Sequence, residues 1–505
     1  MEFLKNRSVL VLGLGESGLA CARFAVRCGA QLRVADTRED APGLAAIQAL
    51  AAQSSLLGTV DIRVGALHPD LLNGITHIVV SPGLSPQRAD VAALLAAAHL
   101  QNVAVCSELD WFSAALQALK ATQHYAPCVL GVTGTNGKTT VTELTAHLCT
   151  EAGIQAVACG NISPAALDAL MAALDAHAAQ PSQPLPAVWV VELSSFQLHY
   201  TQHWQPHAAT FLNLSQDHLD WHADMAQYAQ DKARVFGTAG APTMRIVNRD
   251  DAAVMALANA QSHSFGLDAP TRIGDLGVVQ AGGLAWLAAA VHADPDRKLK
   301  KGESPEVMVQ RLMPAQALRL RGSHNHANAL AALMLARAAG VSMAHMLHGL
   351  RSFEVAANRC ELLHIIHDVE YINDSKGTNV GATVAALNGL GEGRQRLVLL
   401  AGGVGKGQDF SPLATAVQAQ CKAVVCFGQD GGLIAAALAQ SGVPVHPVAT
   451  LAQATQLAAT LASTGDAVLM SPACSSFDQF QNYAHRAQVF RDAVADLMQN
   501  AGGIA

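Results

Sequence analysis

The stretch that decides the fold reads Val129-Leu130-Gly131-Val132-Thr133-Gly134-Thr135-Asn136-Gly137-Lys138-Thr139-Thr140. An apolar run with β-branched residues enters it, glycines interrupt it and a helical pattern follows, which predicts a strand, a phosphate-binding loop and a helix. Glycines let backbone N–H groups close on phosphate oxygens, and the start of the helix adds positive potential. Lys138 is placed to reach the β- and γ-phosphates, and Thr139 or Thr140 to contact Mg²⁺.

This phosphate loop is a variant, because the strict pattern has a glycine where Val132 stands. The competing interpretation is a glycine-rich turn that carries a lysine by chance. The order of strand, loop, Gly-Lys-Thr and helix favours the phosphate loop, since each part stands where phosphate chemistry needs it.

Length and composition restrict what the rest of the chain can be. With 505 residues the chain is too long for one core, so we expect two to four domains. Half of the residues are apolar (51%) and the net charge is −7 without a basic run, which predicts a globular protein that binds no nucleic acid. Ten scattered cysteines without metal-ligand spacing, and no membrane-length apolar segment, predict a cytoplasmic protein with reduced thiols and no membrane insertion.

The residues before the phosphate loop predict a Rossmann-like unit. A strand at Ser8–Leu12 leads into Gly13-Leu14-Gly15-Glu16-Ser17-Gly18, a helix follows, and a second strand ends at an acid about twenty residues on. This pattern holds any nucleotide diphosphate and does not by itself select NAD. The polar residues at these and the next strand ends are Asp36, Thr37, Arg38 and Ser81. Alternatively, these are only turns of a doubly wound sheet.

Two more strands are expected beside the phosphate-loop strand, and both end in polar residues. The strand at 187–191 runs into Glu192, and the strand at 210–214 opens into a loop that contains His218. Because parallel strands end at the same edge of a sheet, we expect Glu192 and His218 to converge with Lys138. A carboxylate at that edge is suited to a metal ion, although a paired or capping acid is the alternative for Glu192.

Other features of the middle region are simpler. A helix is expected at Tyr228–Phe236, in which Lys232 is by composition an ordinary solvated lysine. A long Ala/Leu helix opens near residues 320–328 with amide side chains facing a groove. The segments 178–186 and 291–310 are expected to be exposed, loop-like insertions.

Repeated strand–loop–helix units after residue 356 predict a second doubly wound sheet. Loops that follow its strands contain Lys376, Lys406 and Ser476, which are suited to an anionic ligand. The alternative is that these three residues are scattered surface polar groups.

Several motifs together resemble the Mur ligases, in the same order and over essentially the whole chain. These motifs are Gly134–Thr140, Glu192–Gln197, Asn213–Asp220, Asn373–Asn379 and Ser471–Phe480. One departure is Ser163, which stands where the family pattern Gly-Asn-Ile-Gly has its last glycine. The resemblance implies an α/β protein of three domains: a Rossmann-like domain at 1–124, a central phosphate-loop ATPase domain with a mostly parallel sheet at 125–355, and a Rossmann-like domain at 356–505.

The resemblance also implies an activity. It implies an ATP-dependent amide ligase of peptidoglycan precursor synthesis, in which an acyl phosphate forms and is then attacked by an amine. The motifs of the last domain are those of the member that adds D-glutamate to UDP-N-acetylmuramoyl-L-alanine. The implied cofactors are ATP, two Mg²⁺ ions and a carbamylated lysine, and we expect a monomer.

Matched residue by residue, the resemblance assigns four groups. Catalysis is implied for Lys138, Glu192, His218 and Lys232 (as a carbamate), and metal binding for Thr139, Glu192, His218 and Lys232. ATP binding is implied for Gly134, Thr135, Asn136, Gly137, Lys138, Thr139, Thr140, Asn325, Asn328, Arg359 and Asp374. Binding of the UDP substrate is implied for Ser17, Asp36, Thr37, Arg38, Ser81, Asn161 and His218. Binding of D-glutamate is implied for Lys376, Thr378, Lys406, Ser476, Phe477 and Tyr483.

Three alternatives remain open on the sequence. A ligase similar to folylpolyglutamate synthase would share the central ATPase but not the first domain. A nucleotide-dependent dehydrogenase would bind NAD and leave Lys138 unexplained. A non-catalytic nucleotide-binding regulator would not need Lys138, Glu192 and His218 together.

Overall fold

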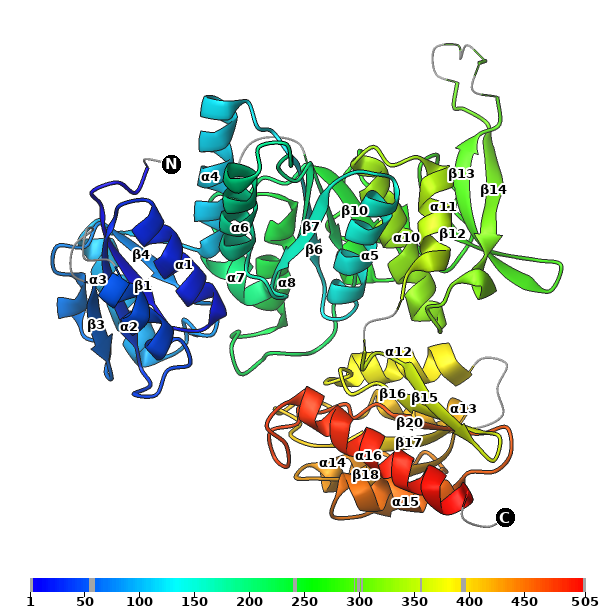
Figure 1. Cartoon of the computed structure of the whole chain (residues 1–505). Helices are drawn as coiled ribbons and strands as arrows, with labels where there is room; N and C mark the ends of the chain where they lie inside the picture. The colour runs from blue at the N-terminus through cyan, green and yellow to red at the C-terminus, as the bar shows by residue number, and fades with distance from the viewer. Residues whose placement is uncertain are drawn as a thin grey trace.

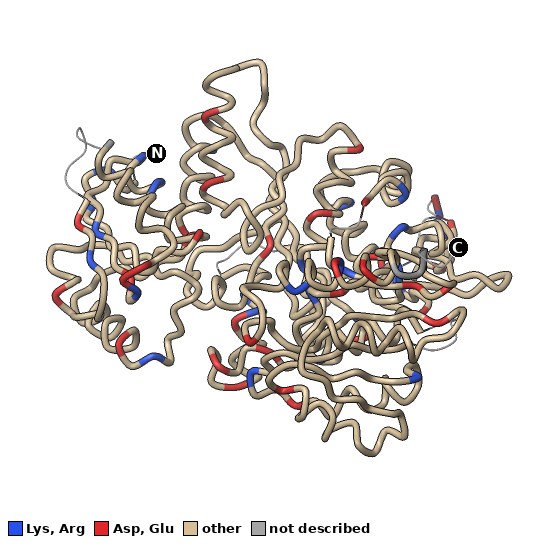
Figure 2. Tube along the Cα trace, turned by 60° about the horizontal axis from the view of Figure 1, so that its bottom comes forward, with Lys and Arg blue, Asp and Glu red and all other residues tan. Residues whose placement is uncertain are grey.

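The computed structural model describes residues 3–53, 60–238, 243–294, 296–297, 300, 303–354, 357–391 and 397–502. Three sheets, each covered by helices, follow one another along the chain and form three domains (Figure 1). The three-domain α/β architecture predicted from the sequence is therefore confirmed. Charged residues of both signs are spread over all three domains (Figure 2).

The first sheet has five parallel strands in the order β3-β2-β1-β4-β5. This is the strand order of the dinucleotide-binding doubly wound sheet without its sixth strand, and the order reverses between β1 and β4. The elements are β1 Ser8–Leu12, α1 Glu16–Arg27, β2 Gln31–Asp36, α2 Leu44–Gln53, β3 Asp61–Val64, η1 Pro69–Leu72, β4 His77–Val80, α3 Ala89–Leu100, β5 Ala104–Cys106 and α4 Glu108–Gln123.

The second sheet has nine strands in the order β14-β13-β12-β11-β10-β9-β6-β8-β7. From β12 to β7 neighbouring strands are parallel, and β12, β13 and β14 are antiparallel. Its strands are β6 Cys128–Thr133, β7 Ala156–Gly160, β8 Val188–Glu192, β9 Ala208–Phe211, β10 Met244–Asn248, β11 His263–Phe265, β12 Leu276–Ala281, β13 Leu284–His292 and β14 Val307–Pro314. Its helices are α5 Lys138–Glu151, α6 Ala166–Ala179, α7 Ser195–Tyr200, α8 Met225–Ala233, η2 Arg234–Phe236, α9 Ala252–Met255, η3 Ala315–Ala317, α10 Ser323–Ala338 and α11 Met343–Ser352.

The prediction of a loop-like insertion over 291–310 is wrong at both of its ends. Val291 and His292 close β13, and 307–310 open β14, with Val291 opposite Met308. The charged residues between these ends indicated a loop, so the β-branched residues on either side of them were not interpreted as strands. Residues 295, 298–299 and 301–302 lie outside the described part. The other predicted insertion, 178–186, is exposed over 178–184, but Ala178 and Ala179 belong to α6 and Pro186 is buried.

The third sheet has six strands in the order β15-β16-β20-β17-β18-β19, of which only the β15–β16 pair is antiparallel. The elements are β15 Glu361–Ile366, β16 Val369–Asn373, α12 Val380–Gly391, β17 Leu397–Gly402, α13 Leu413–Gln420, β18 Cys421–Phe427, α14 Gly431–Ala437, β19 Val445–Pro447, α15 Leu451–Leu461, β20 Ala467–Met470 and α16 Tyr483–Gly502.

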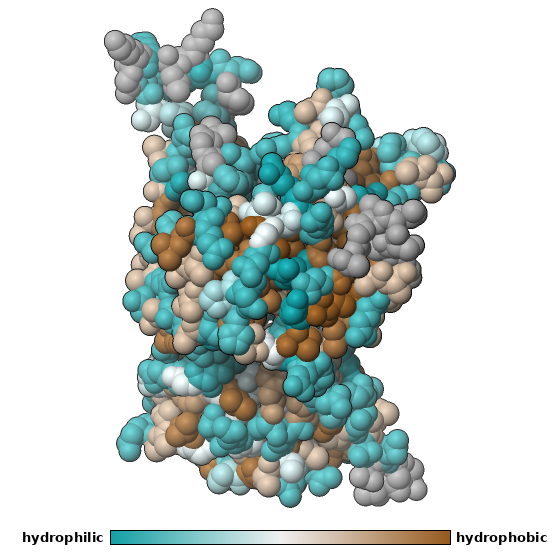
Figure 3. All heavy atoms as spheres, turned by 90° about the vertical axis from the view of Figure 1, so that its left-hand side faces the viewer, coloured by the Kyte–Doolittle hydropathy of each residue, from teal (hydrophilic) through white to brown (hydrophobic). Residues whose placement is uncertain are grey.

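The first two domains share an apolar core through α4. On one side Trp111 packs against Phe24 of α1, and on the other Phe112 meets Trp189 of β8 edge to face, at 5.6 Å between ring centroids. Figure 3 shows the outward side of the N-terminal domain, where hydrophobic side chains lie among hydrophilic ones. The ten cysteines all lie in the described part of the chain and form no disulfide there. No helix among the described residues is long and apolar enough to cross a membrane.

The joint between these two domains also buries an acid. Glu108 is 3% exposed at the first turn of α4, and its Oε1 accepts a hydrogen bond from the backbone N–H of Leu167 at 3.0 Å, at the start of α6. Burial raises the pKa of Glu108 to about 7, although the hydrogen bond from the N–H of Leu167 acts in the opposite direction and lowers this pKa. The folded state therefore favours the protonated acid.

We predict that Glu108 makes folding pH-dependent. Because its pKa is raised in the folded state, its contribution is fully present below about pH 4.5 and is lost as the pH rises through about 7. Relative to Glu108→Gln, the wild type should lose on the order of 3 kcal/mol between pH 5 and pH 8. The midpoint of thermal unfolding at a series of pH values measures this. Glu16→Gln, at an exposed acid of α1, is the control, and parallel profiles for wild type and Glu108→Gln would contradict the prediction.

Candidate active site

The phosphate loop connects β6 to α5, as the sequence predicts. Gly134 and Gly137 have positive φ values of 158° and 84°, and a Cβ on Gly137 would stand 2.5 Å from Asn328 Oδ1. Lys138 is the first residue of α5, and its Nζ donates to the carbonyl oxygens of Gly134 and Thr135 at 2.9 Å each. The lysine charge is thus held over the loop at the start of a helix, where anions bind well.

A cavity of about 240 Å³ opens beside this loop, between the middle and C-terminal domains. The structure brings together in its wall most of the residues predicted to bind ATP. These are Asn136, Gly137, Thr140, Asn325, Asn328, Arg359 and Asp374. Lys376, predicted for D-glutamate, also lines it. Burial raises the pKa of Asp374 to about 6, although Ser471 Oγ donates to its Oδ2 at 2.7 Å.

Several residues of this cavity were not predicted from the sequence, among them Asn248, Asp250, Phe265 and His324. Asn248 ends β10 and Asp250 follows it, so their place at the C-terminal edge of a parallel strand was the available signal. His324 gave no such signal, because it lies on the opening turn of α10.

Glu192, at the end of β8, is 2% exposed, and its Oε1 accepts a hydrogen bond from Asn161 Nδ2 at 2.8 Å. Within the described part of the chain its Oε2 has no hydrogen-bond partner. A buried carboxylate oxygen without a hydrogen-bond donor is suited to bind a cation, and Mg²⁺ prefers oxygen ligands. Among the described residues no group of three or more His, Cys, Asp or Glu side chains is arranged to hold a metal. A Mg²⁺ ion would therefore need hydroxyl, phosphate or water oxygens as further ligands, which is its usual preference.

His218 and Asp217 lie in the loop after β9. His218 has a positive φ of 56°, and its Nε2 is 3.6 Å from Asp217 Oδ2. Burial lowers the pKa of His218 to about 4, although Asp217 raises it, so the imidazole is neutral at neutral pH. Its ring meets Phe196 edge-on, with 4.7 Å between the centroids.

Lys232 is buried, so its interpretation from composition as an ordinary solvated lysine is wrong. The residue is 2% exposed, and its Nζ donates to the carbonyl oxygen of Gly134 at 2.8 Å and lies 4.8 Å from the centroid of the Tyr228 ring. Burial, and next the charge of Lys138, hold the pKa of Lys232 well below its usual value. Sequence missed this burial because the helical pattern of α8 does not show which face the phosphate loop covers.

In the N-terminal domain the predicted UDP residues gather at the ends of β1, β2 and β4. Asp36 is 3% exposed, and its carboxylate accepts from the N–H of Leu14 at 2.7 Å and from the backbone and guanidinium of Arg38. Ser81 Oγ donates to the carbonyl oxygen of Gly13 at 2.9 Å. Asp36 therefore orients Arg38 and the glycine loop rather than standing free as an acceptor. Ser17 and Thr37 are half-buried nearby in the chain.

The residues predicted for D-glutamate are only partly in contact. Lys376 Nζ lies 3.8 Å from the ring centroid of Tyr483, whereas Lys406 Nζ lies 3.7 Å from Asp217 Oδ1 of the middle domain. The remaining three are Thr378, which is half-buried, Ser476, which is buried, and Phe477, which is 74% exposed.

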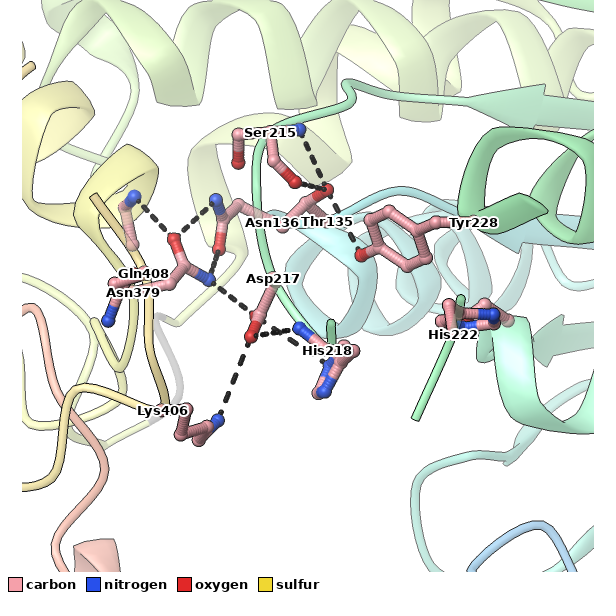
Figure 4. Close-up of polar contacts among 12 residues, drawn as sticks. Thr135, Asn136, Ser215, Asp217, His218, His222, Tyr228, Asn379, Lys406 and Gln408 are labelled. Atoms are coloured by element: carbon pink, nitrogen blue, oxygen red, sulfur yellow. Dashed lines mark hydrogen bonds and ion pairs between the residues drawn. The ribbon is translucent and has the colours of Figure 1, made fainter. Parts of the chain in front are cut away.

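The middle and C-terminal domains meet through a polar junction (Figure 4). Asn136 of the phosphate loop and Asn379 at the start of α12 exchange two amide hydrogen bonds of 3.1 Å each. Asn379 Nδ2 also donates to Asp217 Oδ2 at 3.1 Å, and Gln216 Oε1 accepts from the N–H of Asp409 at 3.0 Å. The sequence assigned no role to Asn379 or Asp217, because a contact between domains leaves no local pattern.

Comparison with family models matches all three domains. A model described as Mur ligase MurD-like, N-terminal domain, matches residues 7–105; Mur ligase middle domain matches 132–336; and Mur ligase, glutamate ligase domain, matches 358–474. The chain is 52% identical over 510 residues to the UDP-N-acetylmuramoylalanine–D-glutamate ligase of Burkholderia cenocepacia (strain HI2424), covering 98% of both chains. Its identity to the enzyme of the same name from Burkholderia vietnamiensis (strain G4 / LMG 22486) is 51% over 510 residues, again with 98% of both covered.

Solved structures share the fold at lower identity. A pseudomurein peptide ligase type C from Methanothermus fervidus aligns with a TM-score of 0.56 at 16% identity, covering 97% of this chain and 100% of that one. The UDP-N-acetylmuramate-alanine ligase of Thermotoga maritima aligns with a TM-score of 0.53 at 18% identity, covering 97% and 99%. A folylpolyglutamate synthase of Mycobacterium tuberculosis, complexed with ADP, aligns with a TM-score of 0.51 at 18% identity over 81% and 98%.

We predict that Gly137→Ala weakens nucleotide binding by at least about tenfold, because its φ of 84° and the 2.5 Å approach to Asn328 Oδ1 would force the loop to move. Gly74→Ala is the matched control. Gly74 has a similar φ of 76° but nothing within 4 Å of its Cβ position, so it carries the backbone strain alone. Titration calorimetry with ATP measures both variants. Equal affinities for Gly137→Ala and Gly74→Ala would contradict the role of this loop.

Proposed function

The chain belongs to the Mur ligase family, and on this premise we propose that it joins D-glutamate to UDP-N-acetylmuramoyl-L-alanine, with conversion of ATP to ADP and phosphate. The observation that carries the proposal is the cavity beside the phosphate loop, whose wall comes from both the middle and the C-terminal domain. A ligase needs that arrangement, because the nucleotide and the incoming amino acid must meet at one point. A dehydrogenase or a nucleotide-binding regulator would not account for Lys138 and Glu192 at the same edge.

In the first step, a carboxylate oxygen of the L-alanyl group attacks the γ-phosphorus of ATP. The bond between that phosphorus and the bridging oxygen breaks, and ADP leaves. We assign Lys138 to the developing charge on the phosphoryl oxygens, since its Nζ is already fixed over the loop by the carbonyls of Gly134 and Thr135. We assign Asn325, Asn328, Arg359 and Asp374 to the adenosine side of the cavity.

In the second step, the amine of D-glutamate attacks the acyl carbon, the nitrogen loses a proton to solvent, and phosphate leaves. Lys406, Lys376 and Thr378 are our candidates to hold its carboxylates, with Ser476, Phe477 and Tyr483 beside them. The N-terminal domain would hold the uridine diphosphate through Ser17, Thr37, Arg38 and Ser81, with Asp36 orienting Arg38. Asn161 and His218 would face the muramoyl part.

Mg²⁺ fits the same edge of the middle sheet. We propose Glu192, Thr139 and His218 as ligands, together with Lys232 as a carbamate, and the unpartnered Oε2 of Glu192 supports this choice. When bound, the metal ion supplies positive charge that stabilises the transferring phosphoryl group. Neutral His218 would not repel it. A cytoplasmic location and a monomeric state remain predictions from the sequence.

Phosphate release from ATP tests the proposal directly. Release should require UDP-N-acetylmuramoyl-L-alanine and D-glutamate together, and L-glutamate or other amino acids should not replace D-glutamate. NAD should not bind, whereas UDP should. Release that needs no acceptor, or that follows a different amino acid, would overturn the proposed function.

We predict that Lys406→Ala raises the KM for D-glutamate about tenfold to a hundredfold and changes the KM for ATP much less. A charge-assisted hydrogen bond contributes roughly 1.5–3 kcal/mol, which corresponds to that range. Lys422→Ala is the control, because Lys422 of β18 pairs with Asp466 instead, at 3.0 Å. Equal effects of Lys406→Ala on the two KM values would identify Lys406 as a phosphate contact.

We predict that Lys232 works as a carbamate. Its burial and its pKa, held low by burial and by Lys138, favour the neutral amine that reacts with CO₂. Lys232→Ala should be nearly inactive and partly restored by acetate, which can fill the space with a carboxylate. Lys232→Arg should stay inactive, since arginine keeps its charge. Incubation with ¹³C-bicarbonate should give a carbamate resonance in the wild type alone, and full activity of Lys232→Arg would rule the role out.

A further inference from the structure

Asn379 uses the whole hydrogen-bonding capacity of its side chain. An asparagine amide has two N–H donors and an oxygen with two lone pairs. Its Oδ1 accepts from the N–H of Ala382 at 2.9 Å and from Asn136 Nδ2 at 3.1 Å. Its Nδ2 donates to Asn136 Oδ1 and to Asp217 Oδ2, both at 3.1 Å. Asn379 is 3% exposed, so each of these bonds replaces one that water would have made.

Three of these four bonds cross from the C-terminal to the middle domain, and the fourth caps α12. The start of α12 is pressed against the middle domain, because a Cβ on Gly381 would stand 2.5 Å from Ser215 Oγ. The two domains are therefore closely packed at this contact. Figure 4 shows Asn379 pointing between Asn136 and Asp217.

Both partners of Asn379 are in segments that the proposed reaction uses. Asn136 is part of the phosphate loop, and its backbone N–H donates to Asn213 Oδ1 at 2.9 Å. Asp217 precedes His218, and its Oδ1 lies 3.7 Å from Lys406 Nζ. Asn379 itself stands three residues after Lys376. One amide thus fixes the phosphate loop and the loop after β9 relative to the domain that would hold the amino acid.

We propose that Asn379 is a positioning residue of the ligation. Its amide sets the distance between the phosphate loop and the C-terminal domain, so that the acyl phosphate forms within reach of the incoming amine. The inference rests on the proposed function and concerns the alignment of two domains, because Asn379 acts through Asn136 and Asp217 and not on the substrate itself.

Two variants separate this role from the capping of α12. Serine and aspartate both cap helices well, so neither variant should lose the cap of α12, and Asn379→Ser should keep the wild-type midpoint of thermal unfolding to within a few degrees. Serine is shorter than asparagine and has one O–H donor in place of the two N–H donors, so it cannot reproduce the bonds to both Asn136 and Asp217, whereas an ionised aspartate has no donor and would bring a second carboxylate to Asp217. We expect kcat/KM for ATP to fall about tenfold to a hundredfold in Asn379→Ser and further in Asn379→Asp, with the KM for the UDP substrate unchanged.

The control is Gln216→Ala, which removes another bond between the same domains, the one that Gln216 Oε1 accepts from the N–H of Asp409. It should keep kcat/KM for ATP within about twofold. In an Asn136→Ala background, Asn379→Ser should cost little more, because the shared bond is already lost. Calorimetric affinity for ATP, measured without the other substrates, gives a readout that does not depend on turnover and should weaken in Asn379→Ser.

Three outcomes would overturn the proposal: wild-type kinetics in both Asn379 variants, an equal loss in Gln216→Ala, or a loss shared by all three substrates together with a lower unfolding midpoint. A wild type that releases no phosphate in response to D-glutamate would instead overturn the proposed function. An active wild type with unaffected variants would overturn the role of Asn379 alone.

Discussion

The loop from Asn213 to His222 is the constraint on which the arrangement of the whole molecule depends, because it is bonded to all three domains. Asn213 holds Asn136 of the phosphate loop, and Asp217 is shared by Asn379 and Lys406 of the C-terminal domain. At its far end, Trp221 Nε1 donates to the carbonyl oxygen of Pro82 at 3.2 Å, next to the predicted UDP contacts. A shift of any one domain would therefore change the position of His218, which lies in the centre of the loop.

The two joints of the molecule differ in kind. Between the first and second domains α4 forms a continuous apolar core, in which aromatic side chains such as Phe112 and Trp189 are buried against one another. Between the second and third domains the bonds in Figure 4 join amides, a carboxylate and a lysine. Each hydrogen bond between neutral groups contributes about 0.5–1.5 kcal/mol and each one to a charged group about 1.5–3 kcal/mol, because water replaces it when the joint opens. The C-terminal joint is thus the easier one to open, which suits a site that must admit ATP between those domains.

What could be predicted from the sequence follows from local patterns and from one rule of sheet geometry. The phosphate loop has its glycines and lysine within a few residues, and the rule that parallel strands end at one edge placed Glu192 there as well. The antiparallel strands β12–β14 were missed, although the Gly282-Gly283 pair between β12 and β13 is a strong hairpin signal. The charged residues nearby led to the prediction of a loop instead of strands. The burial of Lys232 and the role of Asn379 depend on which surface covers them, and neither periodicity nor spacing contains that information.

The charges of the candidate site are balanced only in part by the protein itself. Burial lowers the pKa of Lys138, while the carboxylates of Glu192 and Asp217 act to raise it. As far as the structure describes the chain, Glu192 keeps an oxygen without a partner, and Lys232 contacts a carbonyl oxygen and the face of Tyr228. Burying charged groups without a full set of hydrogen-bonding and ionic partners costs free energy, so these groups at the edge of the sheet destabilise the folded protein. A ligand that brings phosphate oxygens to Lys138, and a cation to Glu192 and to the carbamate proposed for Lys232, offsets that cost, and the same contacts align the reacting groups. In this site the charged residues that lack full hydrogen-bonding or ionic partners in the isolated fold are those best suited to stabilise the transferring phosphoryl group. Electrostatic preorganisation requires such groups, because the reaction supplies their partner.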